Sequence, residues 1–463
     1  MSNSTVAPTK HYPPVSDDIL YDNGALDPIH PEIYPRLTEF RLGSTNSWTQ
    51  GHPYDFYKRM REEAPVMWSP GLNKTSGFWS VSRYDDVKYV EQNPQIFSSQ
   101  RGSMNMAVMP NRGKAERLMN AAFNSLINLD GDVHRELRAQ QMPFFLPQYV
   151  EQLKERVGQK IDQLLDDIEK KGPVVDFAKM FSTQLPLFTL CEMLGVDEED
   201  RPQIAKWMHY LELAPQFLTH PFRMFLAEPM FVFRFEKMLA DMFDYGERVM
   251  ADRIANPRQD LLTTIANASL DGKSMSQSYL DGSWLLIIFA GNDTTRNSLS
   301  GTIRLLTQFE DQRQLVLSDR SLIDRMSNES LRMTSPVMHM RRTAIEDTEI
   351  AGQRIAKDEK VIMWYGSANR DPSVFPNPDT FDLSRDNVEK HMAFGLGVHR
   401  CLGNRIAHMQ LSMAYERILD RFPNIVWTGK QKIEPIILVH AISSLTANLY
   451  GHGGKRPTKV AMS

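Results

Sequence analysis

The spacing of apolar and polar residues along the chain predicts a mainly α protein with small β-sheets. In several long stretches the apolar residues recur every three or four positions, as they do on a helix with one buried face. Alternation over residues 78–82 favours a β-strand, and β-like runs follow at 349–355 and 360–365. The stretches with helical spacing are residues 54–63, 148–170, 174–194, 231–255, 276–308 and 402–420.

The chain shows no obvious internal boundary. No linker rich in Pro, Gly or Ser, no charge block and no internal repeat divides the 463 residues. Length alone would suit about three domains of average size, but the missing boundaries favour one large domain over residues 46–463. Residues 1–45 carry many prolines and tyrosines and are expected to form an irregular N-terminal arm.

Composition and charge exclude several classes of protein. A formal net charge of −4 provides no electrostatic footprint for nucleic acid. Two cysteines cannot build a disulfide framework, and they fit a reducing compartment. Residues 1–18 have no apolar signal-peptide core, and no run of 18 apolar residues follows. We therefore expect a cytoplasmic protein without a transmembrane anchor.

Cys401 lies in the glycine-rich run FGLGVHRCLG, which spans residues 394–403 and precedes an apolar helical stretch. Gly395 and Gly397 permit a backbone turn that residues with a Cβ would resist. The following helix would direct its N-terminal N–H groups towards the sulfur and favour the thiolate. A cysteine in this setting is suited to bind a metal.

Other fates for this cysteine can be weighed from the residues around it. Structural zinc needs four ligands, and the chain has no CxxC pair or spaced Cys/His set. A papain-like nucleophile could use His399 or His391, but the matching local signature is missing. A dinucleotide loop would need a third glycine at the proper offset. A buried cysteine in a plain turn, or a single thiolate on a cofactor metal such as haem iron, remains open.

A polar pair interrupts the apolar helical stretch at 276–308. Asp293 and Thr294 follow Ala290 and Gly291 there, and a buried polar pair is costly unless it is satisfied or used. A glycine inside a helix also costs about 1 kcal/mol relative to alanine. These features predict a local distortion where a small molecule approaches the backbone. Simple exposure of both polar residues at the end of an amphipathic face is an equal alternative.

The run Phe-Gly-x-Gly-x-His-x-Cys-x-Gly resembles the haem-binding signature of the cytochrome P450 family, and the chain matches it at every defining position. The resemblance extends along essentially the whole chain after the N-terminal arm. It implies the cytochrome P450 fold, with haem b between the long central helix and the cysteine loop. It also implies that Cys401 is the metal ligand and that Phe394 and Gly395 bind the cofactor.

The resemblance assigns roles to the central helix and to four cationic or hydrogen-bonding side chains. Ala290 and Gly291 would lie against the haem, while Thr294 and Asp293 would be the catalytic hydroxyl and the proton relay of oxygen activation. The haem propionates would be held by His134, Arg138, Arg342 and His399. Taken individually, each of these four would more often be a solvated charge or a capped histidine.

A second family signature is the Glu329-x-x-Arg332 pair, which Arg385 would complete as a buried structural network. Alone, such an i,i+3 pair is usually an exposed ion pair of small energetic value. The chain departs from the family at residues 130–132, where Asp-Gly-Asp replaces the common Asp-Pro-Pro. That departure affects the start of the next helix and not the spacing of His134 and Arg138.

The implied activity is a monooxygenase that inserts one atom of O₂ into an unactivated C–H bond. Electrons would come from a separate ferredoxin and an NAD(P)H-dependent ferredoxin reductase. The runs at 291–297, 339–344 and 363–365 resemble bacterial alkane and fatty-acid ω-hydroxylases and, in part, terpene and sterol hydroxylases. Segments rich in Met and Phe at 104–109 and 217–235 suggest an apolar substrate. A peroxide-driven peroxygenase and a non-enzymatic haem sensor or carrier are the alternatives.

Overall fold

The computed structural model describes residues 42, 48, 50–69, 77–103, 115–219, 230–434 and 436–451. The expected N-terminal arm therefore lies outside the described residues, apart from Leu42. The segment 104–109 and most side chains of 217–235 lie outside them as well.

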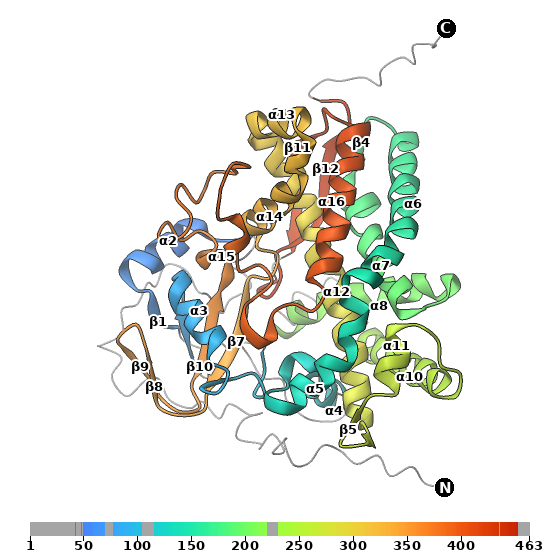
Figure 1. Ribbon diagram of the computed structural model, residues 1–463, viewed down its shortest axis with the longest axis vertical. Helices are drawn as coiled ribbons and strands as arrows, with labels where there is room; N and C mark the ends of the chain where they lie inside the picture. Colours follow the sequence, from blue (N-terminus) through green and yellow to red (C-terminus); the bar gives the residue numbers. More distant parts are fainter. Residues whose placement is uncertain are drawn as a thin grey trace.

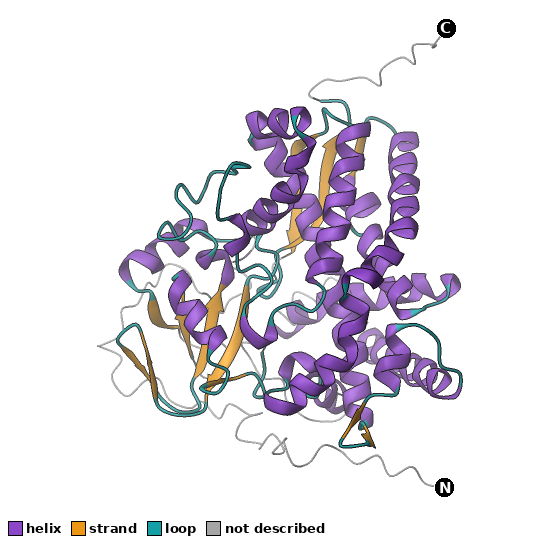
Figure 2. Ribbon diagram, viewed as in Figure 1, coloured by secondary structure: helices purple, strands orange, loops and turns teal. Residues whose placement is uncertain are grey.

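Helices make up most of the molecule. Most of them gather on one side, while the larger sheet lies on the other side with a few helices beside it (Figures 1 and 2). Within the described part of the chain, no helix is both long enough and apolar enough to cross a membrane. The helices are α2 (Tyr54–Glu63), α3 (Tyr84–Gln92), α4 (Ala115–Phe123), α5 (Gly131–Gln141), α6 (Pro147–Lys171), α7 (Gln184–Leu194), α8 (Arg201–Thr219), α10 (Phe231–Ala255), α11 (Leu261–Ala266), α12 (Gln277–Gln308), α13 (Glu310–Ser318), α14 (Ile323–Thr334), α15 (Tyr365–Ala368) and α16 (Asn404–Arg421).

Two sheets and two small hairpins complete the described fold. The larger sheet has the order β1-β2-β10-β7-β3, in which β10 runs parallel to β2 and every other pair is antiparallel. The smaller sheet has the order β11-β12-β4. The strands are β1 (Val66–Ser69), β2 (Phe78–Val81), β3 (Phe97–Ser98), β4 (Val174–Asp176), β5 (Ser269–Leu270), β6 (Lys273–Ser274), β7 (His339–Ala344), β8 (Thr348–Ile350), β9 (Gln353–Ile355), β10 (Lys360–Trp364), β11 (Val426–Glu434) and β12 (Ala441–Asn448).

The predicted mainly α fold with small sheets is confirmed, but two of its elements are wrong. The stretch 174–194 is not one helix, because Val174–Asp176 pairs with β12 and a π-helical turn at Ala178–Ser182 precedes α7. The run 349–355 is a hairpin and not a single strand. Ala351 and Gly352 both adopt positive φ, which reverses the chain between β8 and β9.

The central helix α12 passes through the middle of the molecule and contacts α4, α7, α10 and α14 (Figure 1). One close approach depends on Gly282. A Cβ on this residue would lie 2.3 Å from the carbonyl oxygen of Ala121 and 2.9 Å from the backbone nitrogen of Ser125. The absence of a side chain at Gly282 therefore lets α4 pack directly on the backbone of α12.

Candidate active site

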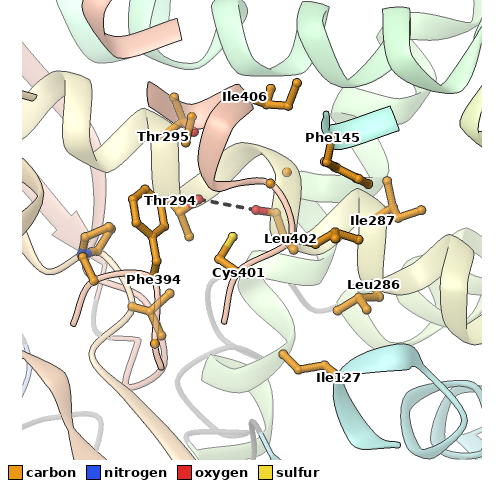
Figure 3. A pocket seen from close by; sticks show the side chains of 18 of the residues that line it. Ile127, Phe145, Leu286, Ile287, Thr294, Thr295, Phe394, Cys401, Leu402 and Ile406 are labelled. Carbon is orange, nitrogen blue, oxygen red and sulfur yellow. Dashed lines mark hydrogen bonds between the residues drawn. The ribbon is translucent and has the colours of Figure 1, made fainter. Parts of the chain in front are cut away.

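A cavity of about 290 Å³ lies between α12 and the loop that carries Cys401. Thr294 and Cys401 come from separate elements and reach the same space (Figure 3). Most of the surrounding side chains are apolar, so the cavity suits a largely apolar occupant. The apolar residues labelled in Figure 3 are Ile127, Phe145, Leu286, Ile287, Phe394, Leu402 and Ile406.

The cysteine loop has the backbone conformation that its glycines predict. Gly395 and Gly397 have φ values of 66° and 65°, in the left-handed region that favours glycine. The Cys401 N–H donates to the carbonyl oxygen of Phe394 at 2.8 Å and closes the loop. A Cβ on Gly397 would lie 2.4 Å from the backbone oxygen of Glu91, so the loop packs tightly on α3.

The thiol of Cys401 is accessible from the cavity but is otherwise surrounded by protein atoms. Burial raises the pKa of this thiol, and the Gly403 N–H and the charges of Arg138 and Arg400 offset the rise only in part. The N–H of Gly403, at the start of α16, favours the thiolate as the sequence predicts, but the effect of burial is larger. A metal that binds the sulfur would itself deprotonate it.

Four predicted cofactor-binding residues meet at one end of the cavity: His134 and Arg138 on α5, Arg342 on β7, and His399 on the cysteine loop. The rings of His134 and His399 are 4.3 Å apart between centroids. His399 Nε2 lies 3.1 Å from Asp130 Oδ1. The structure thus brings together side chains that are up to 265 positions apart in the sequence, since 399 − 134 = 265.

The positive charge at this end comes from the two arginines. Burial lowers the pKa of His134 to about 3, and the nearby His399 and Arg138 add to the effect. Burial also lowers the pKa of His399, against the influence of Asp130. Both imidazoles are therefore neutral near pH 7, whereas Arg138 and Arg342 remain cationic. An acidic group that enters here would meet two guanidinium groups and two imidazole rings.

Glu91 is a functional candidate that the sequence did not indicate. Its Oε2 lies 2.9 Å from Nη2 of Arg342, and Tyr365 donates its hydroxyl hydrogen to Oε1. Both side chains line the cavity beside Arg342. Glu91 and Arg342 are 251 positions apart, and α3 contains no motif that would mark the carboxylate.

From α12, Ala290, Gly291 and Thr294 line the cavity as the sequence predicts. Thr294 Oγ1 donates to the carbonyl oxygen of Ala290 at 3.4 Å, the contact drawn in Figure 3. The predicted local distortion is not found, because α12 continues unbroken through this segment.

Asp293 does not line the cavity. Its carboxylate is buried on another face of α12, where Oδ1 lies 3.3 Å from Nδ2 of Asn292 and 3.4 Å from Nη2 of Arg296. The structure therefore separates Thr294 and Asp293, which the sequence treats as a pair.

The predicted Glu329-Arg332-Arg385 network is confirmed. Arg332 Nε lies 2.7 Å from Glu329 Oε2, and Arg385 Nε lies 3.2 Å from Glu329 Oε1. Glu329 and Arg332 are fully buried. Arg332 also donates to the carbonyl oxygen of Asn369, whose side-chain oxygen accepts from the N–H of Met392 just before the cysteine loop. The network thus supports the loop from behind and does not contact the cavity through its charges.

Comparison with known proteins agrees with this geometry. The family model described as Cytochrome P450 matches residues 42–439. This chain belongs to the cytochrome P450 family. Linalool 8-monooxygenase from Pseudomonas putida is 36% identical over 400 residues, which cover 84% of this chain and 94% of that protein. A methyl-branched lipid omega-hydroxylase from Mycobacterium tuberculosis is 29% identical, covering 88% and 94%.

Solved structures show the same relationship. A Mycobacterium marinum cytochrome P450 in complex with pseudoionone superimposes with a TM-score of 0.80 at 30% identity, covering 92% of this chain and all of that one. As a cytochrome P450, the protein is an oxygen-incorporating oxidoreductase that uses a haem-iron cofactor. The cavity fits that cofactor, because it joins a thiol, apolar walls and a cationic end.

Proposed function

We propose that this cytochrome P450 hydroxylates an unactivated C–H bond of an apolar aliphatic or terpenoid substrate. The placement of Cys401 and Thr294, which come from separate elements, in the lining of one largely apolar cavity carries this proposal. The relatives named for linalool and for methyl-branched lipids support the substrate class. We further propose haem b as the cofactor, and a ferredoxin with its NAD(P)H-dependent reductase as the source of electrons.

The chain offers ligands for each part of haem. Cys401 would bind the iron, and the cationic end of the cavity would receive the propionates. When bound, haem supplies the iron chemistry that activates O₂. The residues proposed to hold it are Cys401, His134, Arg138, Arg342, His399, Phe394, Gly395, Ala290 and Gly291, all of which line the cavity.

The protein's own contribution is to exclude water, orient the substrate and move protons. Leu286 and Ile287 from α12 and Ile127 give the substrate an apolar surface. Thr294 presents a hydroxyl that can accept and return a proton at Oγ1 on the cavity side of α12. We propose that Asp293 feeds protons to Thr294 from the neighbouring face of the helix, beside Arg296.

A carbon monoxide difference spectrum of the reduced protein tests the cysteine. The wild type should give the Soret band typical of thiolate-ligated haem, and Cys401→Ala should lose it. Cys191→Ala is the matched control, because Cys191 is buried in the core on α7 and does not line the cavity. A thiolate-type spectrum that survives Cys401→Ala would overturn the assignment.

The substrate class can be tested by spin-state titration with alkanes, fatty acids, terpenes and sterols. A low-to-high-spin shift should appear with aliphatic or terpenoid compounds, followed by hydroxylated product when ferredoxin, reductase and NAD(P)H are added. Peroxide-supported turnover far above ferredoxin-supported turnover would contradict the proposed electron source. Failure to oxidise any compound despite normal electron delivery would contradict the hydroxylase proposal.

A further inference from the structure

Ser335 has a strained backbone at the edge of the cavity. It ends α14 with φ 39° and ψ 65°, in the left-handed region that residues with a Cβ rarely adopt. The next two residues, Pro336 and Val337, line the cavity wall. The turn at Ser335 therefore sets the direction in which the chain enters that wall. Such a conformation persists only where surrounding contacts over-determine it.

Four hydrogen bonds hold Ser335 in place. Its N–H donates to the carbonyl oxygen of Leu331 at 2.9 Å, and its hydroxyl donates to that of Arg332 at 2.9 Å. The Asn369 side-chain amide donates to the same hydroxyl at 2.8 Å. The carbonyl oxygen of Ser335, which leads into Pro336, lies 2.9 Å from His52 Nε2. His52 precedes α2 and is 283 positions away in the chain.

The surroundings of His52 fix both its protonation and its orientation. A carbonyl oxygen only accepts, so Nε2 must carry the hydrogen, and Nδ1 has no hydrogen-bond partner among the described residues. Burial lowers the pKa of His52 to about 4, so the ring is neutral near pH 7. The ring stacks on Tyr54 at 5.3 Å and meets His440 edge-on at 5.2 Å.

Neighbouring contacts brace the same wall. Tyr54 donates its hydroxyl hydrogen to the carbonyl oxygen of Met333 at 2.9 Å. From the other side, the His440 N–H donates to the carbonyl oxygen of Pro336 at 2.9 Å, and Val337 forms a β-bridge with Val439. None of these contacts reaches Ser335 itself, which is held from outside α14 by the side chains of His52 and Asn369.

We infer that His52 is a positioning residue: its N–H holds the Ser335 turn and thereby fixes the Pro336–Val337 wall against which the substrate is oriented. His52 does not line the cavity, so it acts on the substrate only through this wall. The inference rests on the proposed haem-binding function, because the wall matters to catalysis only if the cavity holds haem and substrate.

Two azole ligands of different size provide the test. Imidazole would bind the haem iron without reaching the wall, whereas 1-phenylimidazole carries an apolar ring into the cavity. His52→Phe keeps an aromatic ring but removes the N–H. The quantity to compare is the ratio of the affinity for 1-phenylimidazole to the affinity for imidazole. This variant should lower the ratio about fivefold, the effect of one lost hydrogen bond. His52→Gln places an amide N–H near the position of Nε2 and should return this affinity ratio most of the way to the wild-type value.

Tyr54→Phe is the matched control, because it removes the contact with Met333 and leaves Ser335 alone; its ligand ratio should equal that of the wild type. Should His52→Phe not fold, His52→Asn, whose amide is too short to reach Ser335, replaces it. If His52→Phe lowers the melting temperature but leaves the affinity ratio unchanged, the role of His52 is merely structural and the inference is overturned. Equal affinity ratios for His52→Gln and for His52→Phe, or for its replacement His52→Asn, would overturn it as well. Failure of the proposed function looks different, since the wild type itself would then show no azole spectrum.

Discussion

At the scale of single residues, Glu91 supplies the negative charge that balances Arg342 beside the cavity. Its carboxylate contacts the guanidinium and accepts the hydroxyl hydrogen of Tyr365. Both Glu91 and Arg342 are buried, so neither charge is well solvated if its partner is removed. Breaking such a pair from one side is much more destabilising than losing a single neutral hydrogen bond.

Glu91→Gln should lower the free energy of unfolding by about 3 kcal/mol, because it leaves the guanidinium buried without its counter-charge. Tyr365→Phe removes a hydrogen bond from the same carboxylate but keeps the ion pair, and should cost about 1 kcal/mol. Urea unfolding of haem-loaded protein, followed by fluorescence and by the Soret band, measures both. Equal losses in the free energy of unfolding for Glu91→Gln and Tyr365→Phe would show that the charge of Glu91 does not contribute to stability.

Local sequence was sufficient to predict the conformation of the cysteine loop, but not the residues that other elements place around the cavity. The turn at Gly395 and Gly397 follows from glycines a few positions from Cys401, and the structure has it. Glu91 could not be found this way, because its partnership with Arg342 exists only after α3 packs beside β7. Asp293 was paired with Thr294 by adjacency, but only Thr294 lines the cavity, because the Asp293 carboxylate lies on another face of α12 beside Asn292 and Arg296.

At the scale of elements, hydrophobic periodicity located the long helices well. The predicted stretches 54–63, 231–255 and 276–308 agree with α2, α10 and α12 within one residue. The error at 174–194 has a non-local cause. Three residues of that stretch form hydrogen bonds with β12, more than 260 positions later in the chain, and no local pattern announces such a pairing.

The packing of α4 on α12 gives a prediction at this scale. Gly282→Ala would place a methyl group against backbone atoms of α4, which cannot turn aside as a side chain can. The overpacking should cost about 1–3 kcal/mol, offset in part by about 1 kcal/mol of helix propensity. Hydrogen exchange should become faster over residues 115–125, where α4 would be pushed away.

Gly301→Ala is the matched control on the same helix. Its new methyl group would meet Cγ2 of Thr334, 2.4 Å away, and not a backbone atom. Thr334 is buried and its hydroxyl donates to the carbonyl oxygen of Ser330, so this variant should also lose stability, but it should leave exchange in α4 unchanged. Equal exchange profiles for the two variants would contradict the role assigned to Gly282.

At the scale of the whole molecule, buried neutral histidines set the response to acid. Burial lowers the pKa of His52 to about 4, and the charges of Arg370 and Arg304 act in the same direction. Burial lowers the pKa of His391 to about 3, assisted by His408, Arg400 and Arg332. The N–H of Ala393 donates to Nδ1 of His391 at 3.2 Å, an arrangement that requires a neutral ring.

These shifts make the folded state sensitive to pH from 6.5 downwards. In the unfolded chain both histidines take up a proton near the ordinary histidine pKa of 6.5. In the folded protein His52 takes up its proton only at about pH 4 and His391 only at about pH 3. The stability that these two histidines contribute is therefore fully present above pH 6.5. It is lost as the pH falls from 6.5 towards the pKa of each histidine in the folded protein. Each group should remove about 1.4 kcal/mol per pH unit within this range.

Urea midpoints between pH 7 and pH 4 measure the slope. His391→Gln cannot take up this proton and should flatten the fall by about 1.4 kcal/mol per pH unit, whatever its effect on stability at pH 7. His209→Gln is the control for the loss of a histidine as such, because His209 lies exposed on α8. A slope for His391→Gln equal to that of the wild type would mean that other groups govern acid unfolding.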